Sequence, residues 1–427
     1  MDSVARGMLI NLATRMLALA GVLLITTITA RLGTSQQGVF ALFTSIEGVM
    51  LALLSGFGIA LARRVSHHGE APLALLSAMV LCCIALGTVA GGVLWALSVW
   101  GPPAYAMLWL LGLAAPLLLL APNLAGLWLG AGQMAPMARL TLAPPFIALA
   151  LLAGLWLVQR TGLVPVLAAW VGAKVLVGIG LLAVLWRAGR LVAPGFGALR
   201  AELPFIATIG LTNLIGLLNY RVGLFIIERL LGLSATGVYS IAVVVAELLW
   251  FVSSSLTQAV YGRIGTPDRA QAAAITVRVV QLSVAALLLA APLSWALASW
   301  LVPALLGPDY SASLPLMAWL LPGVLMFGGA SALSAYFTNH AGKPQVPARV
   351  ATLSLLLNGG LCLLLVPRLG MAGAALSASL SYAASVLVLA ALFARHAGMP
   401  LMAVLRPAPQ LWLDLRALAS RSGRTGG

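Results

Sequence analysis

Two stretches of this sequence, LGTSQQGVF at residues 32–40 and LGLSATGVY at residues 231–239, carry the same pattern at an offset of 199. The similarity extends over residues 32–64 and 231–263, with eight identities in 33 positions. Each copy follows one long apolar segment and opens the next one. A repeat of this kind indicates one structural unit used twice, so we predict two halves built on a common plan.

The composition shows which solvent the two halves face. The chain has 427 residues, of which 62% are hydrophobic and 8% charged, and its mean hydropathy is +1.07. Soluble domains have about 25% charged residues. We therefore predict an all-α polytopic membrane protein. Its net charge of +15 is assigned to cytoplasmic loops rather than to a nucleic-acid partner.

Twelve apolar segments are each long enough to cross a bilayer core, which takes about 20 residues. Loop-forming stretches such as WGPP and HAGKP separate them. The first segment is too long for the apolar core of a cleavable signal and is predicted to remain as a helix. The predicted spans cover residues 8–30, 38–62, 72–100, 104–130, 139–158, 163–186, 204–230, 236–262, 271–300, 312–338, 345–366 and 371–394.

The repeat and the spans together predict the domain organisation. Six spans separate the two copies, so both copies cross the membrane in the same direction. We expect two six-helix lobes related by a pseudo-two-fold axis along the membrane normal, with a cavity between them. The predicted parts are an N-terminal lobe at 1–186, a basic cytoplasmic linker at 187–203, a C-terminal lobe at 204–394 and a basic cytoplasmic tail at 395–427.

The distribution of basic residues predicts the orientation. Of the 24 Lys and Arg residues, 17 lie at the termini and in alternate loops, and three lie within spans. The opposite loops carry only Arg31, Arg160, Arg229 and Arg368. By the positive-inside rule, both termini are cytoplasmic.

Charged residues within the spans are the first candidates for a functional site. A charge at the bilayer centre costs about 2.5–3.5 kcal/mol on insertion scales. The bases are Arg15, Lys174 and Arg221, and the acids are Glu47 and Glu247. In one interpretation these charges only form structural ion pairs, such as Arg15 with Glu47, or Arg221 with Glu228 seven residues later. The excess of bases favours an anionic ligand.

Uncharged polar residues extend the candidate cavity wall. Asn11 and Arg15 share one helix face at a spacing of four, and Asn219 lies in a small, polar stripe of the seventh span. The eighth span carries Ser240, Glu247, Ser254 and Gln258 on one narrow stripe. Either the stripe packs against a neighbouring helix, or it lines the cavity and binds a coupling ion through Glu247.

Several activities are disfavoured by what the sequence lacks. It contains no GxxxxGK[ST] phosphate loop, and Cys82, Cys83 and Cys362 lie in apolar runs. His67 and His68 have no further ligands at metal-binding spacing. The outer loops are short and offer few acids. We predict no metal, no cofactor and no catalytic residue.

Two segments resemble polysaccharide-type flippases of the multidrug/oligosaccharidyl-lipid/polysaccharide (MOP) superfamily. They are TRMLALAGVLLITTITARLGTSQQGVFALF at 14–43 and NYRVGLFIIERLLGLSATGVYSIAVVVAELLW at 219–250. The resemblance implies transport of an undecaprenyl-diphosphate-linked oligosaccharide to the outer leaflet of a bacterial inner membrane, by two lobes that open alternately. It also implies cationic cavity residues, for which Arg15, Arg221 and Lys174 are the candidates. Arginine suits a diphosphate because its forked donors bind phosphate bidentately.

This resemblance also implies partners and leaves alternatives. The partners are the lipid-linked oligosaccharide and the bilayer, with H⁺ or Na⁺ as a coupling ion and glycan-assembly proteins as further candidates. The main alternative is an ion-coupled multidrug exporter of the same superfamily, whose cationic drugs favour acids in the cavity. A membrane glycan ligase or polymerase is the alternative from the enzyme class.

The predicted topology can be tested by labelling. In a cysteine-free background, single cysteines at Ser66 and Phe196 should resist a membrane-impermeant thiol reagent added to intact cells, because both lie on the basic, cytoplasmic side. Cysteines at Ser35 and Ser311 should react. Labelling at Phe196 from outside would rule out the twelve-span topology.

Overall fold

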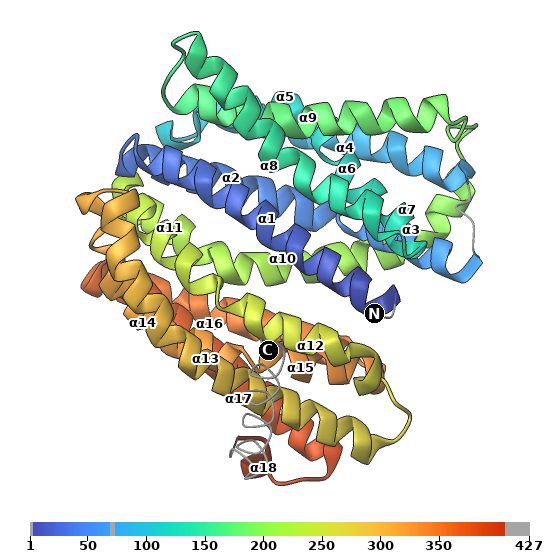
Figure 1. Ribbon diagram of the computed structural model, residues 1–427, viewed down its shortest axis with the longest axis vertical. Coiled ribbons are helices and arrows are strands. Elements are labelled where there is room, and N and C mark those ends of the chain that lie inside the picture. Colours follow the sequence, from blue (N-terminus) through green and yellow to red (C-terminus); the bar gives the residue numbers. More distant parts are fainter. Residues whose placement is uncertain (1–2, 69–72, 406–427) are drawn as a thin grey trace, which may run out of the picture. The chain divides into compact units, whose positions relative to one another are not determined.

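The computed structural model describes residues 3–68 and 73–405, which form helices joined by short turns and loops (Figure 1). Twelve of its helical segments are long and apolar enough to cross a membrane. This confirms the predicted all-α fold with 12 membrane-spanning segments. The predicted tail lies outside the described residues from 406 onward.

By packing, the chain divides into two compact units, residues 1–218 and 219–427. The division falls inside the long helix α10 (Phe196–Leu231), so each unit contains part of it. The other elements of the N-terminal unit are α1 (Ser3–Ala30), α2 (Thr34–Leu54), α3 (Gly56–His68), α4 (Leu73–Trp100), η1 (Pro103–Tyr105), α5 (Leu108–Leu118), α6 (Leu120–Leu124), α7 (Gly126–Gly130), α8 (Met134–Leu157) and α9 (Leu163–Arg187).

The described residues of the C-terminal unit are likewise helices joined by short turns and loops. One turn of it is π-helical, η3 (Tyr336–His340). The other elements are α11 (Leu233–Glu247), α12 (Trp250–Ile264), α13 (Arg269–Leu305), η2 (Pro308–Tyr310), α14 (Ser313–Phe327), α15 (Ala330–Ala335), α16 (Gln345–Leu369), α17 (Met371–Ala397) and α18 (Leu401–Leu405).

The repeated Leu-Gly pair marks the tight turns before α2 and α11. Gly33 has φ 125° and precedes α2, and Gly232 has φ 85° and precedes α11. Non-glycine residues rarely adopt these angles because of their Cβ atom. Gly33 N donates a hydrogen bond to Ala30 O at 3.0 Å, which closes the turn at the end of α1. The repeat therefore places a glycine with positive φ before the next helix in both halves, although the hydrogen bonds differ, since Gly232 N donates to Ile227 O and Glu228 O.

Four of the predicted continuous spans are broken in the structure, since the fourth is divided among α5, α6 and α7 and the tenth among α14, α15 and η3. The second is divided between α2 and α3 at Ser55, and the eighth between α11 and α12 after Glu247. At the breaks in the second and eighth spans, a backbone N–H donates to the carbonyl three residues earlier instead of four. Ser55 N donates to Ala52 O at 3.3 Å, and Leu249 N donates to Ala246 O at 3.2 Å. Hydrophobicity alone identifies the span and does not register such a local change in hydrogen bonding.

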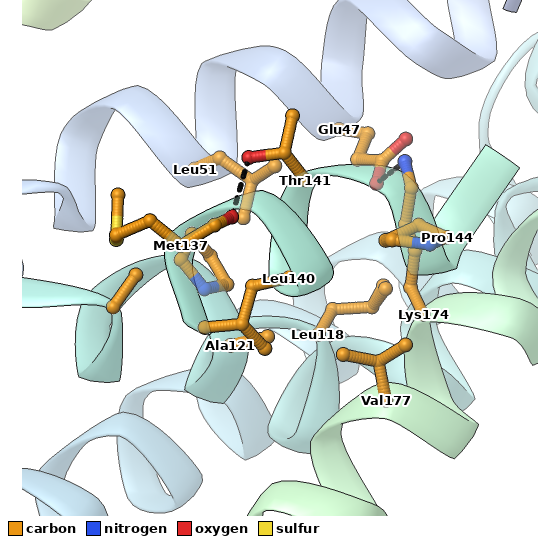
Figure 2. Close-up of a pocket in the computed structure, with 12 residues that line it drawn as sticks. Glu47, Leu51, Leu118, Ala121, Met137, Leu140, Thr141, Pro144, Lys174 and Val177 are labelled. Carbon is orange, nitrogen blue, oxygen red and sulfur yellow. Dashed lines mark hydrogen bonds and ion pairs between the residues drawn. The ribbon is translucent and has the colours of Figure 1, made fainter. Parts of the chain in front are cut away.

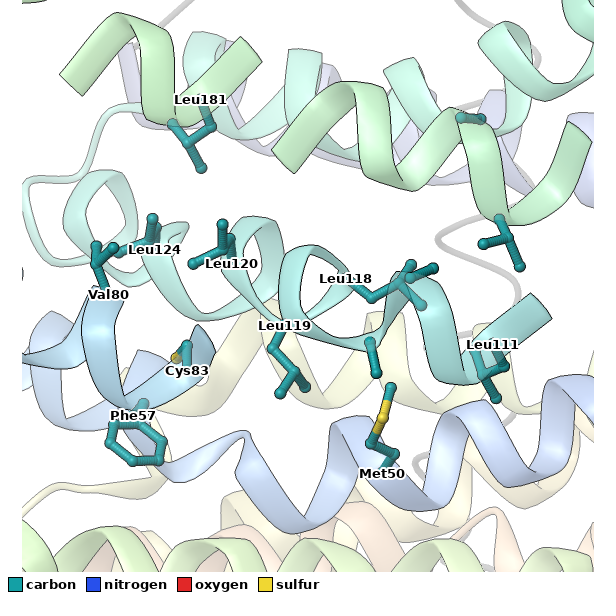
Figure 3. Packing of buried hydrophobic residues seen from close by; sticks show 14 of the residues in the cluster. Met50, Phe57, Val80, Cys83, Leu111, Leu118, Leu119, Leu120, Leu124 and Leu181 are labelled. Carbon is teal, nitrogen blue, oxygen red and sulfur yellow. The ribbon is translucent and has the colours of Figure 1, made fainter. Parts of the chain in front are cut away.

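The core of the N-terminal unit is built around α5 and α6 (Figure 3). Leu119 and Leu120 are both fully buried although they are adjacent in the sequence. Successive helical side chains point about 100° apart, so burial of both means that helices cover α5 and α6 on more than one side. In Figure 3 Leu119 lies between Phe57 of α3 and Met50 of α2.

The first part of α10 packs on α2 and α3. A Cβ atom added at Gly56 would meet the backbone of Ile206, and one at Gly210 would meet Leu53 O. The buried carboxylate of Glu202 pairs with Arg63 Nη2 at 2.6 Å and also with Arg64. These contacts explain why α10 begins at Phe196 rather than at the predicted Pro204. The later part of the predicted linker is a packed helix of the N-terminal unit.

The close crossing of α4 and α5 generates a stability prediction. A Cβ added at Gly91 would meet Gly112 O, whereas one at Gly92 would meet nothing within 4 Å. Gly91→Leu should therefore destabilise the protein by at least about 1–3 kcal/mol, the usual cost of overpacking. Gly92→Leu is the matched control and should be nearly neutral. Unfolding of both variants in detergent gives the comparison, and equal stabilities would contradict the crossing.

Candidate functional site

An acid–base pair lies inside the N-terminal unit, between α2 and α9. Glu47 is only 2% exposed, and its Oε1 accepts a hydrogen bond from Lys174 Nζ at 2.5 Å. Its Oε2 accepts a hydrogen bond from Trp170 Nε1 at 2.8 Å. Trp170 and Lys174 are four residues apart on α9, so they share one face. Both oxygens of the buried carboxylate are bonded, which offsets much of its desolvation cost.

Aromatic rings complete the surroundings of Lys174. Its Nζ lies 3.9 Å from the centroid of the Trp170 ring, and Phe40 meets that ring edge-on at 5.5 Å. A cation over an aromatic face is attracted by the negative charge density of the ring. Lys174 is therefore neutralised by Glu47 and also held by Trp170.

A cavity of about 270 Å³ opens beside this pair (Figure 2). Its walls come from α2, α5 to α6, α8 and α9, and are mostly apolar. The Thr141 hydroxyl donates to Met137 O at 2.9 Å within α8, so its proton is already used. Glu47 and Lys174 are the charged groups of the lining. The cavity is too small for a glycan and suits a small ion, water or part of a larger cargo.

A second acid–base pair lies in the C-terminal unit, between α10 and α11. Arg221 Nη2 lies 3.2 Å from Glu247 Oε2. The other oxygen, Oε1, is buried and has no hydrogen-bond partner among the described residues. The sequence suggested Glu228 as the structural partner of Arg221, but the ion pair forms with Glu247. This pair is looser than Glu47–Lys174, because its N–O distance is 3.2 Å rather than 2.5 Å.

Four aromatic rings gather next to Glu247: Tyr220, Trp250, Phe327 and Tyr382. Their centroids are 5.0–6.2 Å apart in all six pairings. Trp250 follows Glu247 in the sequence and opens α12 after the break. The buried Nε1 of Trp250 has no hydrogen-bond partner among the described residues. A cavity of only about 10 Å³ adjoins Glu247 and three of these rings, those of Tyr220, Trp250 and Tyr382. We call these four residues the aromatic cluster.

The predicted polar stripe of the eighth span is not continuous. Ser240 and Glu247 belong to α11, whereas Ser254 and Gln258 belong to α12 beyond the break. Ser240 is buried and donates to Gly237 O at 2.7 Å, while Gln258 is exposed. A stripe calculated at 100° per residue assumes one unbroken helix, and the structure does not have one here. That Ser254 and Gln258 line a cavity with Glu247 stays a prediction.

Arg15 and Asn219 belong to neither of the two ion pairs. Arg15 is exposed, and among the described residues no ion pair joins it to Glu47. Asn219 is 3% exposed, and its backbone oxygen accepts a hydrogen bond from Asn358 Nδ2 at 2.9 Å. Asn11 lies in α1, but its side chain is outside the described part of the structure. No three His, Cys, Asp or Glu side chains gather as metal ligands among the described residues.

Trp170 and the aromatic cluster were missed by sequence reasoning. Trp170 carried a signal, since it precedes the intramembrane Lys174 by one helical turn. The cluster carried none, because its members come from α10, α12, α14 and α17. Aromatic residues are common in apolar spans, and only the packing of these helices brings the four rings together.

Sequence comparison finds no matching family model and no matching curated protein. Comparison of the fold with solved structures does find matches. An inward-facing multidrug-resistance MATE transporter of the MOP superfamily has a TM-score of 0.73 at 13% identity, over 91% of this chain and 94% of that one. The lipid II flippase MurJ, in an inward closed conformation, has a TM-score of 0.74 at 13% identity, over 98% and 93%.

The chain shares the fold of these two solved structures. A third match is a MOP-superfamily transporter from Pyrococcus furiosus, with a TM-score of 0.62 at 14% identity over 94% of this chain and 96% of that one. Its description links a reversed polarity of the binding pocket to a different function. These identities establish the fold alone. The cargo has to be argued from the charges and rings of this chain.

The Glu47–Lys174 pair yields a prediction about stability. Lys174→Met should leave a buried, uncompensated carboxylate and lower the free energy of unfolding by about 3–5 kcal/mol. Adding Glu47→Gln removes that charge, so the double variant should recover most of the loss. Arg160→Met, at an exposed position in the same unit, is the control. Unfolding in detergent measures all four proteins, and a double variant as unstable as Lys174→Met would contradict the ion pair.

Proposed function

We propose that this protein carries an undecaprenyl-diphosphate-linked oligosaccharide from the inner to the outer leaflet of a bacterial inner membrane by alternating access, without catalysing a reaction. The observation that carries the proposal is the charge balance within the spans. Each intramembrane acid has one base as its partner, Lys174 for Glu47 and Arg221 for Glu247. The third base, Arg15, is left over and exposed. These five span residues therefore carry a net positive charge, which suits an anionic headgroup.

Arg221 is the best-placed residue to exchange partners. Its side chain is 24% exposed, and one contact of 3.2 Å holds it to Glu247. A guanidinium group has five N–H donors in a forked array, so one carboxylate contact leaves most of them available. A diphosphate can take the place of Glu247 by accepting two of these hydrogen bonds at once. Arg221 then has an anionic partner with or without cargo.

This exchange also offers a way to couple cargo binding to protons. While Glu247 is charged, it competes with the diphosphate for Arg221. A proton on Glu247 removes that competition and leaves Arg221 as an uncompensated cation, which favours the cargo. Loss of the proton restores the ion pair and releases the cargo. Na⁺ bound at the free Oε1 of Glu247 would act in the same sense.

Lys174 is the weaker member of the proposed clamp. Its partner Glu47 is held by Trp170 as well, and Lys174 lies over the Trp170 ring. An anion that draws Lys174 away breaks both the ion pair and the ring contact. Arg15 and Arg221 are therefore the main headgroup ligands in this proposal, and Lys174 contributes to the field of the N-terminal unit.

The aromatic cluster favours a second candidate function, export of organic cations. Aromatic faces bind organic cations, and desolvated contacts contribute about 2 kcal/mol each. Glu247 beside the rings would supply the counter-charge once Arg221 moved away. The MATE matches among solved structures are described as multidrug-resistance transporters. For such a cargo the rings must separate, because the cavity beside them has a volume of only about 10 Å³.

The flippase proposal predicts the effect of removing Arg221. In a strain lacking this protein, Arg221→Ala should restore glycan export ten- to over a hundredfold less well than the wild type, because one charged hydrogen-bonded contact contributes about 1.5–3 kcal/mol. Arg221→Lys should retain part of the activity, since it keeps the charge and loses the fork. The measurement is the lipid-linked glycan that accumulates on the cytoplasmic side, normalised to protein in the membrane.

Two further variants separate the proposal from its competitors. Arg229→Ala, on the same helix but exposed, should export normally. If Arg221 only neutralises Glu247, then Arg221→Ala combined with Glu247→Gln should restore export, and the clamp would be wrong at this residue. If the cargo is an organic cation, the wild type moves no glycan, and Trp250→Ala lowers tolerance to cationic drugs.

A further inference from the structure

A basic pocket lies in the C-terminal unit, and no residue of either acid–base pair lines it. It has a volume of about 380 Å³. The end of α17 contributes Arg395 and His396, and the loop before α16 contributes Lys343. The apolar part of the lining consists of Phe337, Val346 and Leu392. By the positive-inside assignment this end of the unit faces the cytoplasm, as do the termini.

Among the described residues that line this pocket, no acid balances the positive charge. Lys343 and Arg395 are exposed, and no acid is among the residues that line the pocket. Asp268, the acid at the start of α13, is occupied as a helix cap and accepts from Ala270 N at 2.9 Å. An anion that entered the pocket would therefore meet two cationic side chains without competition.

The pocket is also rigidly built on the side of the π-helical turn. Tyr336 of η3 is fully buried, and its hydroxyl lies 3.0 Å from His396 Nδ1. Lys343 N donates to Phe337 O at 2.7 Å, which ties the loop carrying Lys343 to the same turn. Lys343 Nζ lies 3.5 Å from His396 Nε2. Single π-helical turns occur frequently at functional sites, where they reposition side chains.

An exposed apolar strip continues from the pocket along α16 and α17. Leu353 is seven residues beyond Val346 on α16 and 52% exposed, and Val388 is one turn before Leu392 on α17 and 37% exposed. These spacings keep each pair on one helix face. The site thus combines a basic head region with an apolar strip that runs into the predicted hydrocarbon layer.

We propose that this pocket binds the phosphate headgroup of an anionic phospholipid of the cytoplasmic leaflet, whose acyl chains lie along the strip of α16 and α17. Basic pockets between transmembrane helices on this side of a membrane suit such lipids. The chain's own C-terminal segment is not the complementary occupant, because residues 406–427 carry four Arg and one Asp. The site does not depend on which cargo the protein moves.

The test uses the full-length protein, stripped of lipid in detergent and then exposed to phosphatidylglycerol, to phosphatidylcholine or to inorganic phosphate. Native mass spectrometry should show selective retention of phosphatidylglycerol over phosphatidylcholine. Lys343→Gln with Arg395→Gln should weaken that retention about twenty- to thirtyfold, equivalent to about 2 kcal/mol for two basic residues. Arg187→Gln with Arg190→Gln removes the same charge from exposed positions of the N-terminal unit and should leave retention unchanged.

Three outcomes would overturn the proposal. Equal retention of the two lipids by the wild type would show that no headgroup is selected. Displacement of phosphatidylglycerol by millimolar inorganic phosphate would show a site for soluble anions, with no contribution from the strip. Equal losses in the two double variants would show a general charge effect. The wild-type comparisons decide the first two points even if the pocket variant folds poorly.

Discussion

The cost of holding charge in hydrocarbon is the constraint on which the interior of this protein depends. Both intramembrane acids are placed beside a base, and both pairs lie within a single unit. Their surroundings differ: Glu47 uses both oxygens, whereas Glu247 uses one, and its other oxygen is buried with no hydrogen-bond partner in the part of the chain that the structure describes. A saturated pair stabilises a lobe. In the Arg221–Glu247 pair, one carboxylate oxygen is unbonded and the guanidinium group is partly exposed, so Arg221 can more readily exchange Glu247 for another anion. The proposed transport site therefore centres on Arg221.

The backbone responds to the same constraint. Polar backbone groups in lipid must be bonded within the protein, so an interruption of a span is tolerated where the chain re-forms tighter bonds and packs against other helices. The break after Glu247 does this, and it is also what brings Trp250 to the aromatic cluster. The same interruption thus positions the acid of one pair and the rings beside it. The π-helical turn at Tyr336 has a comparable local role at the basic pocket.

Helix α10 connects these features along the chain. Its first part is held to the N-terminal unit by Glu202 with Arg63 and Arg64, and by the close approach of Gly56 to Ile206. Its second part carries Arg221 and belongs to the C-terminal unit. The residue proposed to bind the headgroup is therefore on the helix that runs through the division between the units. Cargo binding at Arg221 and movement of the lobes would share this mechanical element.

The sequence by itself determined the membrane class, the twelve spans and the turns at Gly33 and Gly232, because apolar length and a required positive φ are local properties of the chain. It also identified the intramembrane charges, since any charge stands out in an apolar segment. Only the tertiary structure decided their partners: Glu47 joins Lys174, 127 positions away, and Arg221 joins Glu247 rather than the nearer Glu228. Partner choice depends on which helix faces meet, and apolar spans of similar composition do not encode that locally. The break in the eighth span shows the same limit, because it divides a polar stripe that one unbroken helix would have kept together.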